Sequence, residues 1–292
     1  VYYMNRAWIV DSYNLGTVTS DSSSGGIVGE HWRYGGALVN VMNLGEVKLD
    51  KEETSIDVKS IVGEKGYALE MIDNVFYVAP GRNEHYGTAV TAAQLADGSV
   101  ASLMHAYDYA GFEGSVWGQN VGTDSHPVLT GEVKSATFEA RTVTFDTHGG
   151  ENIEIAAPKG FAVRIPDIER AGYENLGWFG NPEFKGDTLS HVAAADTDAT
   201  VWGKFMAVAS ITLNTNGGTV DSGMVEKYTE GLGAKLPKKV SRDGYVFVGW
   251  YAEEDFSGNR VQAVGPDATG AQVFYARWYK METPAKDDAG CY

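Results

Sequence analysis

The sequence of 292 residues has almost no cysteine, little basic charge and no long apolar run. Its single cysteine, Cys291, excludes an internal disulfide framework and a metal site made from several cysteines. Lysine and arginine number 23 against 39 aspartates and glutamates, so the formal net charge is −16. An acidic chain without a basic stripe repels phosphate backbones, which excludes nucleic-acid binding. Because no apolar run approaches ~18 residues, we expect no insertion into a membrane.

Motifs of catalysis, cofactor binding and metal binding are missing as well. None of the six histidines belongs to an HExxH motif, and GxSxG, GxGxxG and Walker-type sequences are absent. Adjacent carboxylates are interpreted as solvated charge rather than as a glycosidase dyad. His105, Asp108, Asp124 and His126 lack the spacing of metal ligands. We therefore expect no catalytic residue, no metal ion and no cofactor, and interpret the chain as a non-enzyme.

Glycine and strand-forming residues are plentiful instead. Glycine occurs 36 times, well above the ~7% of an average protein, and valine, threonine, tyrosine and tryptophan accompany it. This composition favours tight turns between short strands, so we predict a mainly β fold. The length suits roughly two domains. Because the chain begins at Val1 and carries no signal peptide, we interpret it as a piece of a longer protein.

The first third carries a loose repeat that contains asparagine. Its copies are SYNLGTV at residues 12–18, VMNLGEV at 41–47 and the decayed MIDNVFY at 71–77. The first two are followed by GGIVG at 25–29 and SIVG at 60–63. Asn14, Asn43 and Asn74 are spaced by 29 and 31 residues. A period of this length predicts a solenoid with stacked turn asparagines; a ligand groove along the asparagines is the alternative.

This pattern resembles the GLUG-type repeats of bacterial surface proteins, and the GGIVG segment carries the resemblance best. The match covers roughly residues 8–80 and is poorest in the third copy, which lacks the trailing glycines. The resemblance implies turns of a right-handed parallel β-solenoid. We assign residues 1–80 to these turns.

Residues 81–135 predict a small helical cap. Apolar residues between 88 and 105 recur with a period near 3.6, and Gly98 interrupts them, so we expect two short helices or one broken helix. Residues 116–129 resemble the terminal segment that follows such solenoids in gut-bacterial surface proteins. Since an open solenoid end exposes unpaired strand edges, we expect this segment and its Trp117 to cover that end.

The second half is a tandem duplication. TVTFDTHGG at residues 142–150 matches SITLNTNGG at 210–218, and RAGYENLGWF at 170–179 matches RDGYVFVGWY at 242–251. Alternating apolar residues predict half-buried strands, and the Gly-Gly pairs predict tight turns. The order of these blocks resembles the Listeria–Bacteroides repeat, also called the internalin B-type repeat. That resemblance implies two tandem β-grasp-like domains of an extracellular bacterial protein.

The predicted organisation follows from these patterns. After the solenoid turns (1–80) and the mixed helical and loop cap (81–135), we place the repeats at 136–206 and 207–280, followed by a polar tail at 281–292. The residues between the repeats, 206–209, are too few for a flexible tether.

Aromatic pairs at corresponding places in the two repeats are the candidate binding residues. Successive residues of a strand face opposite sides, so Trp178 and Trp250 are expected in the small cores with Phe179 and Tyr251 facing outward. We name Phe179 and Tyr251 as binding candidates, with a carbohydrate platform as the hypothesis.

The predicted function is non-enzymatic: adhesion or a display and spacer role in a protein of the bacterial cell surface or secreted from the cell. The expected partner is a host or matrix protein or a glycan whose identity the sequence does not reveal, and the expected state is a monomer. The alternative is an accessory region, with carbohydrate binding as one role, of a secreted glycosidase or metallopeptidase. Reading the coding sequence beyond both ends distinguishes the two.

Overall fold

The computed structural model describes residues 3–4, 7–31, 35–50, 58–65, 69–78, 86–109 and 111–282, so the predicted polar tail from 283 onward and Cys291 lie outside the described residues. The chain divides into two compact units. The first consists of Val1–Phe145, Ile153–Asp167 and Leu189–Val201, and the second of Asp146–Asn152, Ile168–Thr188 and Trp202–Tyr292. In the described part no helix is long and apolar enough to cross a membrane.

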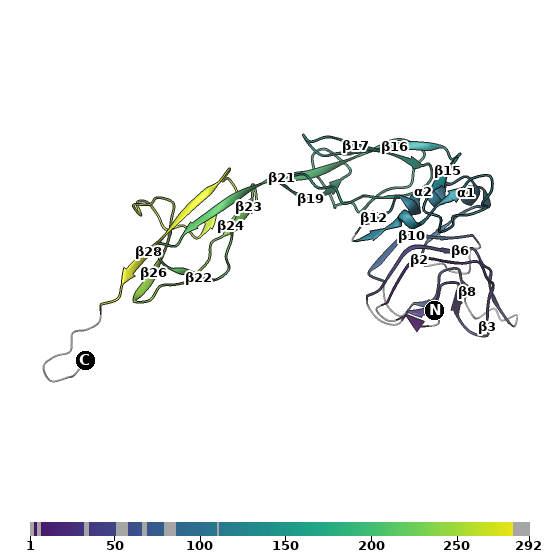
Figure 1. Ribbon diagram of the computed structural model, residues 1–292, viewed down its shortest axis with the longest axis horizontal. Helices are drawn as coiled ribbons and strands as arrows, with labels where there is room; N and C mark the ends of the chain where they lie inside the picture. Colours follow the sequence, from purple (N-terminus) through teal and green to yellow (C-terminus); the bar gives the residue numbers. More distant parts are fainter. Residues whose placement is uncertain are drawn as a thin grey trace. The chain divides into compact units, whose positions relative to one another are not determined.

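Parallel sheets form the N-terminal part of the first unit. The largest has the strand order β11-β10-β6-β2, and its neighbouring strands are parallel. Strands β2, β6 and β10 come from successive sequence copies and lie side by side (Figure 1). Shorter parallel pairs join the same copies elsewhere. The strands are β1 (Tyr3–Met4), β2 (Trp8–Asn14), β3 (Val18–Ser20), β4 (Ser24–Gly25), β5 (Val28–His31), β6 (Ala37–Asn43), β7 (Val47–Leu49), β8 (Val58–Lys59), β9 (Val62–Lys65), β10 (Met71–Tyr77) and β11 (Thr88–Ala89).

The third copy of the N-terminal repeat is aligned differently from the prediction. Asn14 lies opposite Asn43, and its amide donates to Asn43 Oδ1 at 2.8 Å. On β10, however, Tyr77 lies opposite Asn43, while Asn74 donates to Asn40 Oδ1 at 3.1 Å. The prediction that Asn74 continues the row of Asn14 and Asn43 is therefore wrong, because the last step is 34 residues rather than 31.

Left-handed backbone at one position of each strand explains this alignment. Asp11, Asn40 and Asn74 have φ angles of 44°, 52° and 47°, a conformation that asparagine and aspartate tolerate better than other non-glycine residues. Asn14 and Asn43 are instead turn asparagines, each bonded to the backbone of the glycine two residues later. This confirms the stacked-turn interpretation for that pair.

Two short helices follow, as predicted, and the chain breaks between them at Gly98, whose φ is 88°. They are α1 (Ala92–Ala96), with a capping box of Thr91 and Gln94, and α2 (Ser99–His105). The last turn of α2 lies along the parallel sheet: the amides of Asn40 and Asn74 donate to the carbonyls of Met104 and Leu103 at 3.3 and 2.9 Å.

Within the predicted cap, β11 pairs with β10 at the end of the sheet, whereas α2 and the segment around Trp117 lie along three strands rather than at the end where the sequence predicted them. Trp117, which has no exposed surface, donates through Nε1 to Asp11 Oδ1 on β2 at 2.8 Å, so α2 and the segment after it contact β2, β6 and β10 together. The physical reason lies in the free carbonyls at a helix C-terminus, which need donors that the left-handed asparagines supply. The elements after α2 are β12 (Asp108–Tyr109), β13 (Phe112–Glu113), the 3-10 helix η1 (Gly114–Val116), β14 (Gln119–Asn120) and β15 (Val133–Lys134).

The first duplicated segment contributes antiparallel pairs to both units. In the first unit, β16 pairs with β17 and β18 with β20. In the second unit, β19 pairs with β21, a strand of 16 residues that continues into the second duplicated segment. Residues 206–209 thus lie inside a strand. The elements are β16 (Ala140–Asp146), β17 (Ile153–Pro158), β18 (Val163–Arg164), β19 (Tyr173–Phe179), β20 (His191–Val192) and β21 (Ala199–Asn214).

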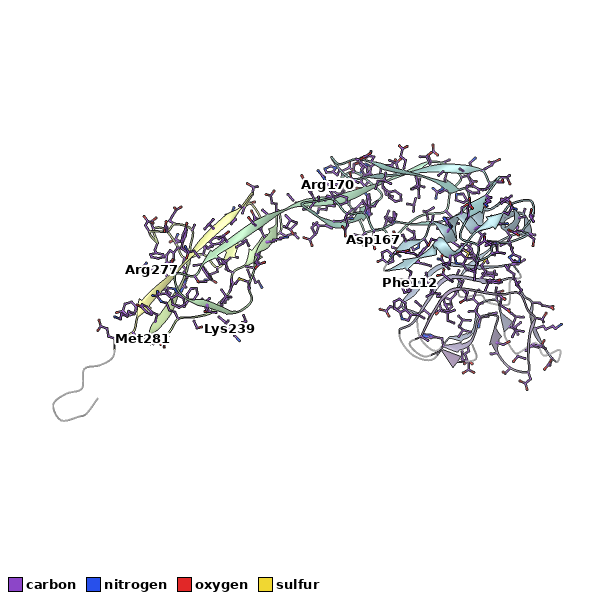
Figure 2. The ribbon with its side chains drawn as sticks, in the orientation of Figure 1. Phe112, Asp167, Arg170, Lys239, Arg277 and Met281 are labelled. Carbon is purple, nitrogen blue, oxygen red and sulfur yellow. The ribbon has the colours of Figure 1, made fainter. Side chains whose placement is uncertain are left out.

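In the second duplicated segment the first and last strands pair in parallel, β21 with β28, and β26 pairs with β28 antiparallel. Strand β23 runs antiparallel to β21 just before this pairing begins. Lys239 and Arg277 mark β25 and β28 in the side-chain view (Figure 2). The remaining elements are β22 (Thr219–Ser222), β23 (Lys227–Thr229), β24 (Ala234–Lys235), β25 (Lys239–Ser241), β26 (Tyr245–Tyr251), β27 (Ala263–Val264) and β28 (Gln272–Lys280).

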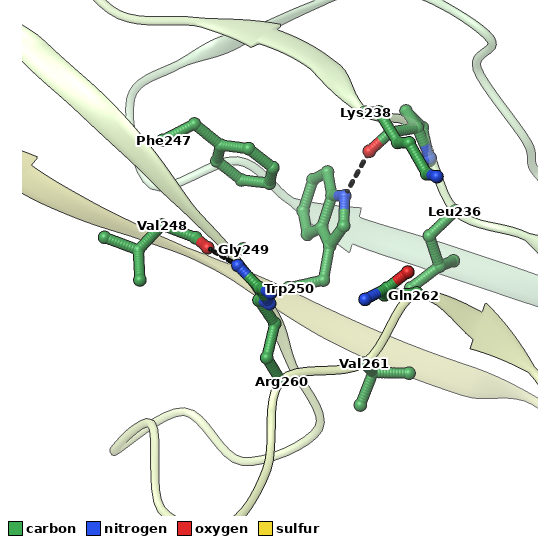
Figure 3. A pocket seen from close by; sticks show the side chains of 10 residues that line it. Leu236, Lys238, Phe247, Val248, Gly249, Trp250, Arg260, Val261 and Gln262 are labelled. Carbon is green, nitrogen blue, oxygen red and sulfur yellow. Dashed lines mark hydrogen bonds between the residues drawn. The ribbon is translucent and has the colours of Figure 1, made fainter.

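The core of the second segment gathers around Trp250, which is 2% exposed and packs with Leu236 and Phe247 (Figure 3). Trp178 is 5% exposed. The prediction that both tryptophans are core residues is confirmed.

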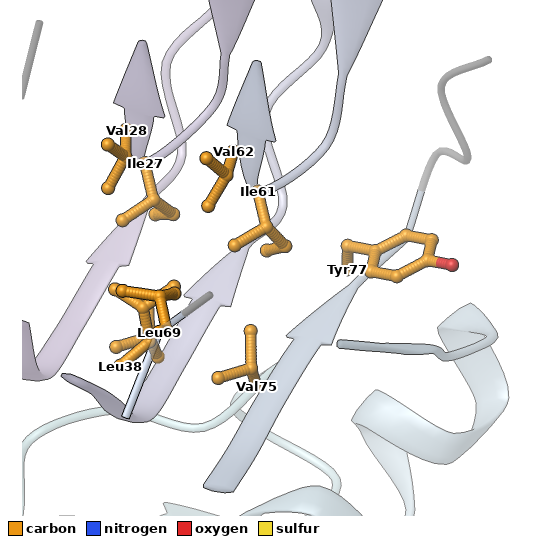
Figure 4. Packing of buried hydrophobic residues seen from close by; sticks show 9 residues of the cluster. Ile27, Val28, Leu38, Ile61, Val62, Leu69, Val75 and Tyr77 are labelled. Atoms are coloured by element: carbon orange, nitrogen blue, oxygen red, sulfur yellow. The ribbon is translucent and has the colours of Figure 1, made fainter. Parts of the chain in front are cut away.

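The core of the parallel sheets consists of aliphatic residues from successive copies, with one aromatic residue at its edge (Figure 4). Ile27 and Val28 of the first copy lie next to Ile61 and Val62 of the second, because β5 and β9 are in parallel register. Similar side chains of neighbouring copies stack on one another and are thereby removed from water. Each copy therefore needs no separate core of its own.

Candidate binding pocket on the second repeat

An open pocket with a volume of about 280 Å³ lies over the core tryptophan of the second duplicated segment. Its floor is apolar, its rim carries three polar side chains and one aromatic ring, and every residue belongs to the second unit. We use floor for the lining residues Leu236, Pro237, Val248, Gly249, Trp250 and Val261, and rim for the lining residues Lys238, Phe247, Arg260 and Gln262.

Trp250 is held in one orientation. Its indole Nε1 donates to the carbonyl of Pro237 at 2.8 Å, which satisfies the polar atom of a buried side chain. Phe247 meets the indole edge to face, with ring centroids 5.5 Å apart and planes at 69°. The aromatic part of the pocket is therefore preformed.

Gly249 makes room for Arg260. The register of β26 and β28 shifts between Phe247 and Gly249, and Gly249 has a φ of 149°. A Cβ there would lie 2.1 Å from Cδ of Arg260. Without it, Arg260 runs beside β26 and donates through Nη1 to the carbonyl of Val248 at 3.1 Å (Figure 3). The glycine thus fixes a guanidinium group at the rim.

The two cations at the rim are exposed, and neither forms an ion pair with a carboxylate in the described part of the chain. Arg260 uses one N–H on the backbone and has others free for a ligand, since a guanidinium carries five. In a chain with a net charge of −16, Lys238 and Arg260 thus place two positive charges on the lining of this pocket.

In sequence, the two duplicated segments share the apolar residues at the floor positions but not those at the rim positions. The pairings Val163 with Val192 and Ala234 with Val264 set the correspondence. The floor positions are conservatively occupied in the first segment by Ile165, Pro166, Leu176, Gly177, Trp178 and Leu189. At the rim, Lys238, Phe247, Arg260 and Gln262 correspond to Asp167, Asn175, Thr188 and Ser190. The cationic, aromatic rim is specific to the second segment.

The predicted binding residues Phe179 and Tyr251 lie outside this pocket. They are 7% and 8% exposed, so the expectation that they face solvent is wrong. Phe184 and Phe256 cover them edge to face at 5.7 and 5.8 Å. Strand alternation places Phe179 and Tyr251 opposite the tryptophans, but the loop that follows each strand folds back over them.

Sequence reasoning missed Lys238, Phe247, Arg260 and Gln262. A signal was available in the alignment of the duplicated segments, where the four rim positions change in character while the floor positions do not. The spacing of the residues within one segment contains no such signal.

A second cluster surrounds the buried carboxylate of Asp73 in the first unit. The Tyr107 hydroxyl donates to Oδ2 at 2.8 Å, Arg164 Nη1 lies 3.3 Å from the same oxygen, and His191 Nε2 lies 2.9 Å from Oδ1. Ser190 Oγ lies 3.0 Å from His191 Nδ1. The series of serine, histidine and aspartate has the residue types of a hydrolase triad.

The contacts assign this cluster to structure. Burial raises the pKa of Asp73, but hydrogen bonds from His191 and Tyr107 and the charge of Arg164 outweigh burial and hold the pKa below its usual 3.8. Burial and the Asp73 carboxylate raise the pKa of Tyr107. Ser190 does not line the neighbouring cavity of about 320 Å³, to which Arg164 contributes. We interpret the cluster as a structural ion-pair network that links β10 to β18 and β20.

Within the described residues, no three histidine, cysteine, aspartate or glutamate side chains are placed to hold a metal ion. His105 Nδ1 lies 2.7 Å from the Trp117 carbonyl, and His126 Nδ1 lies 2.7 Å from the Pro127 carbonyl. Asp124 accepts from the backbone N–H of Asn120 at 2.7 Å.

The comparisons with known proteins agree with the duplication. Residues 142–201 and 210–277 match the family model of the Listeria–Bacteroides repeat domain. Two proteins of Evansella cellulosilytica are similar to the chain. One, named "Putative Gly-rich membrane protein", is 23% identical over 301 residues, which cover 94% of this chain and 33% of the relative. The other, named "Putative membrane protein", is 24% identical over 152 residues, which cover 47% of this chain and 22% of the relative. The chain thus spans a third or less of these relatives.

Proposed function

We propose that this chain, which carries two Listeria–Bacteroides repeat domains, is a non-enzymatic segment of a bacterial cell-surface or secreted protein with a role in adhesion or display. Repeat domains of this kind are typical of bacterial surface proteins. The observation that carries the proposal is that strand β21 runs from the first repeat into the second without a linker.

Contacts at the junction of the repeats support a display role. The backbone N–H of Val208 donates to the Gly172 carbonyl at 2.8 Å, and β21 pairs with β23 over Val208–Ser210. The Thr229 hydroxyl donates to the Glu174 carboxylate. Bonds on both sides of β21 restrain this junction far more than a flexible linker would. A junction without a flexible linker suits a display or spacer role.

We propose further that the N-terminal sheets are turns of a β-solenoid related to the GLUG-type repeats. The parallel register of successive copies, the stacked Asn14 and Asn43, and the shared aliphatic core support this (Figure 4). For the second repeat, the parallel pairing of its first and last strands supports a β-grasp-like fold.

The proposed location is extracellular, and the proposed partner is a host or matrix protein or a glycan, bound by a monomer. The alternative is an accessory region of a secreted glycosidase or metallopeptidase. The aromatic pocket on the second repeat is compatible with either. A catalytic domain encoded beyond one end of the chain would favour the alternative, and a signal peptide with an anchor sequence would favour adhesion or display.

Protease treatment of intact cells tests the location. In the bacterium that encodes the chain, an antibody against residues 142–277 should detect the protein on whole cells or in the medium, and added protease should remove the cell-bound signal. A cytosolic enzyme serves as the control for cell lysis. Detection only after lysis would overturn the proposal. Binding to immobilised matrix proteins and to a glycan array then tests adhesion.

A further inference from the structure

We propose that the pocket on the second repeat binds a uronic-acid residue of an acidic glycan, with Arg260 holding the carboxylate and Lys238 adding a second positive charge at the rim. The inference builds on the proposed adhesion or display function by naming the class of ligand. It assigns no such role to the first repeat.

The cations supply the recognition of charge. A guanidinium binds a carboxylate through two parallel N–H bonds, and an ammonium group adds an untethered charge nearby. Arg260 is positioned for this by its bond to the Val248 carbonyl and by the absence of a side chain at Gly249. Since neither Arg260 nor Lys238 has a carboxylate partner in the described residues, an incoming carboxylate displaces no ion pair.

The rest of the pocket suits a sugar ring better than a flexible side chain. Phe247 and Val261 offer apolar surface for the C–H groups of a pyranose ring, and the Gln262 amide can both donate to and accept from hydroxyl groups. The volume of about 280 Å³ lies just below the ~300–1,000 Å³ typical of sites for drug-sized molecules. A single ring fits such a pocket while the remainder of a polymer stays outside.

The first repeat supplies an internal comparison. At the corresponding positions it has Asp167 for Lys238 and Thr188 for Arg260, which replaces two positive charges with one negative charge. Asn175 takes the place of Phe247, so the first repeat lacks the aromatic side chain of the rim. Because the apolar residues at the floor positions persist, the rim is not required for folding of the repeat, and its composition in the second repeat calls for a different explanation.

The test uses the full chain and two matched probes, a short oligogalacturonate and its methyl ester, titrated calorimetrically. The ester keeps the rings and hydroxyls but removes the charge. We expect the acid to bind and the ester to bind at least tenfold more weakly, since hydrogen bonds to a charged group are worth more than ~1.4 kcal/mol, a factor of ten. Equal binding of acid and ester would overturn the proposal, as would no binding of the acid.

Variants locate the site. Arg260→Thr and Lys238→Asp introduce the residues of the first repeat and should each weaken oligogalacturonate binding about tenfold or more. Lys239→Asp is the matched control: it makes the same charge change on the next residue, which is exposed and does not line the pocket (Figure 2). Thermal unfolding should be unchanged in all three variants. If Lys239→Asp weakens binding as much as Lys238→Asp, the effect is one of overall charge, and the proposal fails.

Poly-glutamate separates glycan from peptide recognition. We expect it to bind at least tenfold more weakly than oligogalacturonate at equal carboxylate concentration. Equal binding through Arg260 would make the ligand an acidic peptide and overturn the assignment to a glycan. If the protein is found on the cell surface but binds no oligogalacturonate, this inference fails and the proposed function remains. If the protein binds oligogalacturonate but is found only inside the cell, this inference stands and the proposed function fails.

Discussion

His191 on β20 lies with Nε2 2.9 Å from Oδ1 of Asp73 on β10, so a strand of the first Listeria–Bacteroides repeat is joined to a strand of the N-terminal parallel sheet. The position opposite His191 in the β18–β20 pair is Arg164, which contacts the other carboxylate oxygen of Asp73. The guanidinium of Arg164 also lies 3.4 Å from the ring centroid of Tyr109. Two cross-strand neighbours thus share one buried carboxylate within the first unit.

We predict that Asp73→Asn destabilises the first unit by about 3–5 kcal/mol, because removal of one partner leaves the charge of a mostly buried arginine uncompensated. Hydrogen exchange of residues 71–77, followed by mass spectrometry, measures the change. Glu139→Gln is the control in the same unit: it breaks an exposed ion pair with Lys159, and we expect no measurable effect. Equal protection from hydrogen exchange in wild type and Asp73→Asn would show that the contacts of Asp73 contribute no stability.

The stabilisation by Asp73 should depend on pH in a defined direction. Its pKa in the folded state lies below 3.8, the ordinary value of the unfolded chain. Above about pH 5 the carboxylate is charged in both states, so the stabilisation is fully present. As the pH falls below 3.8, the unfolded chain takes up the proton first, and the stabilisation is lost as the pH passes through the folded pKa.

The measurement is the difference in free energy of unfolding between wild type and Asp73→Asn. We expect it to shrink as the pH falls below about 4. A difference that grows as the pH falls from about 4 would mean that the folded pKa of Asp73 is raised instead.

Asn40 combines a left-handed backbone with buried hydrogen bonds, and the two contributions can be separated. The side chain is 1% exposed, donates to the Met104 carbonyl and accepts from Asn74. Asn40→Gly removes the bonds but permits the φ of 52°. Asn40→Ala removes the bonds and adds about 1–2 kcal/mol of backbone cost.

We therefore expect both Asn40 variants to be less stable than wild type and the alanine variant to be the less stable of the two. Hydrogen exchange of α2 and β6 provides the measurement. If the glycine variant were less stable than the alanine variant, the backbone at residue 40 would not be left-handed.

The structural features that follow directly from the periodicity and the duplication of the sequence were predicted correctly. The parallel pairing of β2 and β6 follows from two copies with the same Asn-Leu-Gly turn, and the buried Trp178 and Trp250 follow from strand alternation. These are local or repeated features, which a single chain displays without reference to distant contacts.

The errors concern contacts between distant segments. The shift at Tyr77 depends on α2, whose carbonyls bond to Asn74, and no spacing within the repeat contains that information. Likewise the pocket depends on Arg260 returning to the bulge at Gly249. The burial of Tyr251 depends on Phe256, whose φ of 60° lets the loop turn back over the strand.

The last prediction concerns the independence of the repeats. Trp250→Ala removes a 2% exposed indole and its bond to the Pro237 carbonyl, which should destabilise the second repeat by about 3–5 kcal/mol. Protection from hydrogen exchange should fall in β26 and β28 and persist in β6 and β10, because the clusters of buried side chains around Trp250 and around Leu38 share no residue. Tyr279→Ala, on β28 and 66% exposed, should change the free energy of unfolding by less than about 0.5 kcal/mol. Loss of protection throughout the chain in Trp250→Ala would mean that the repeats and the parallel sheets fold as one cooperative unit. Unchanged stability would place the indole outside the core and make it available to a ligand.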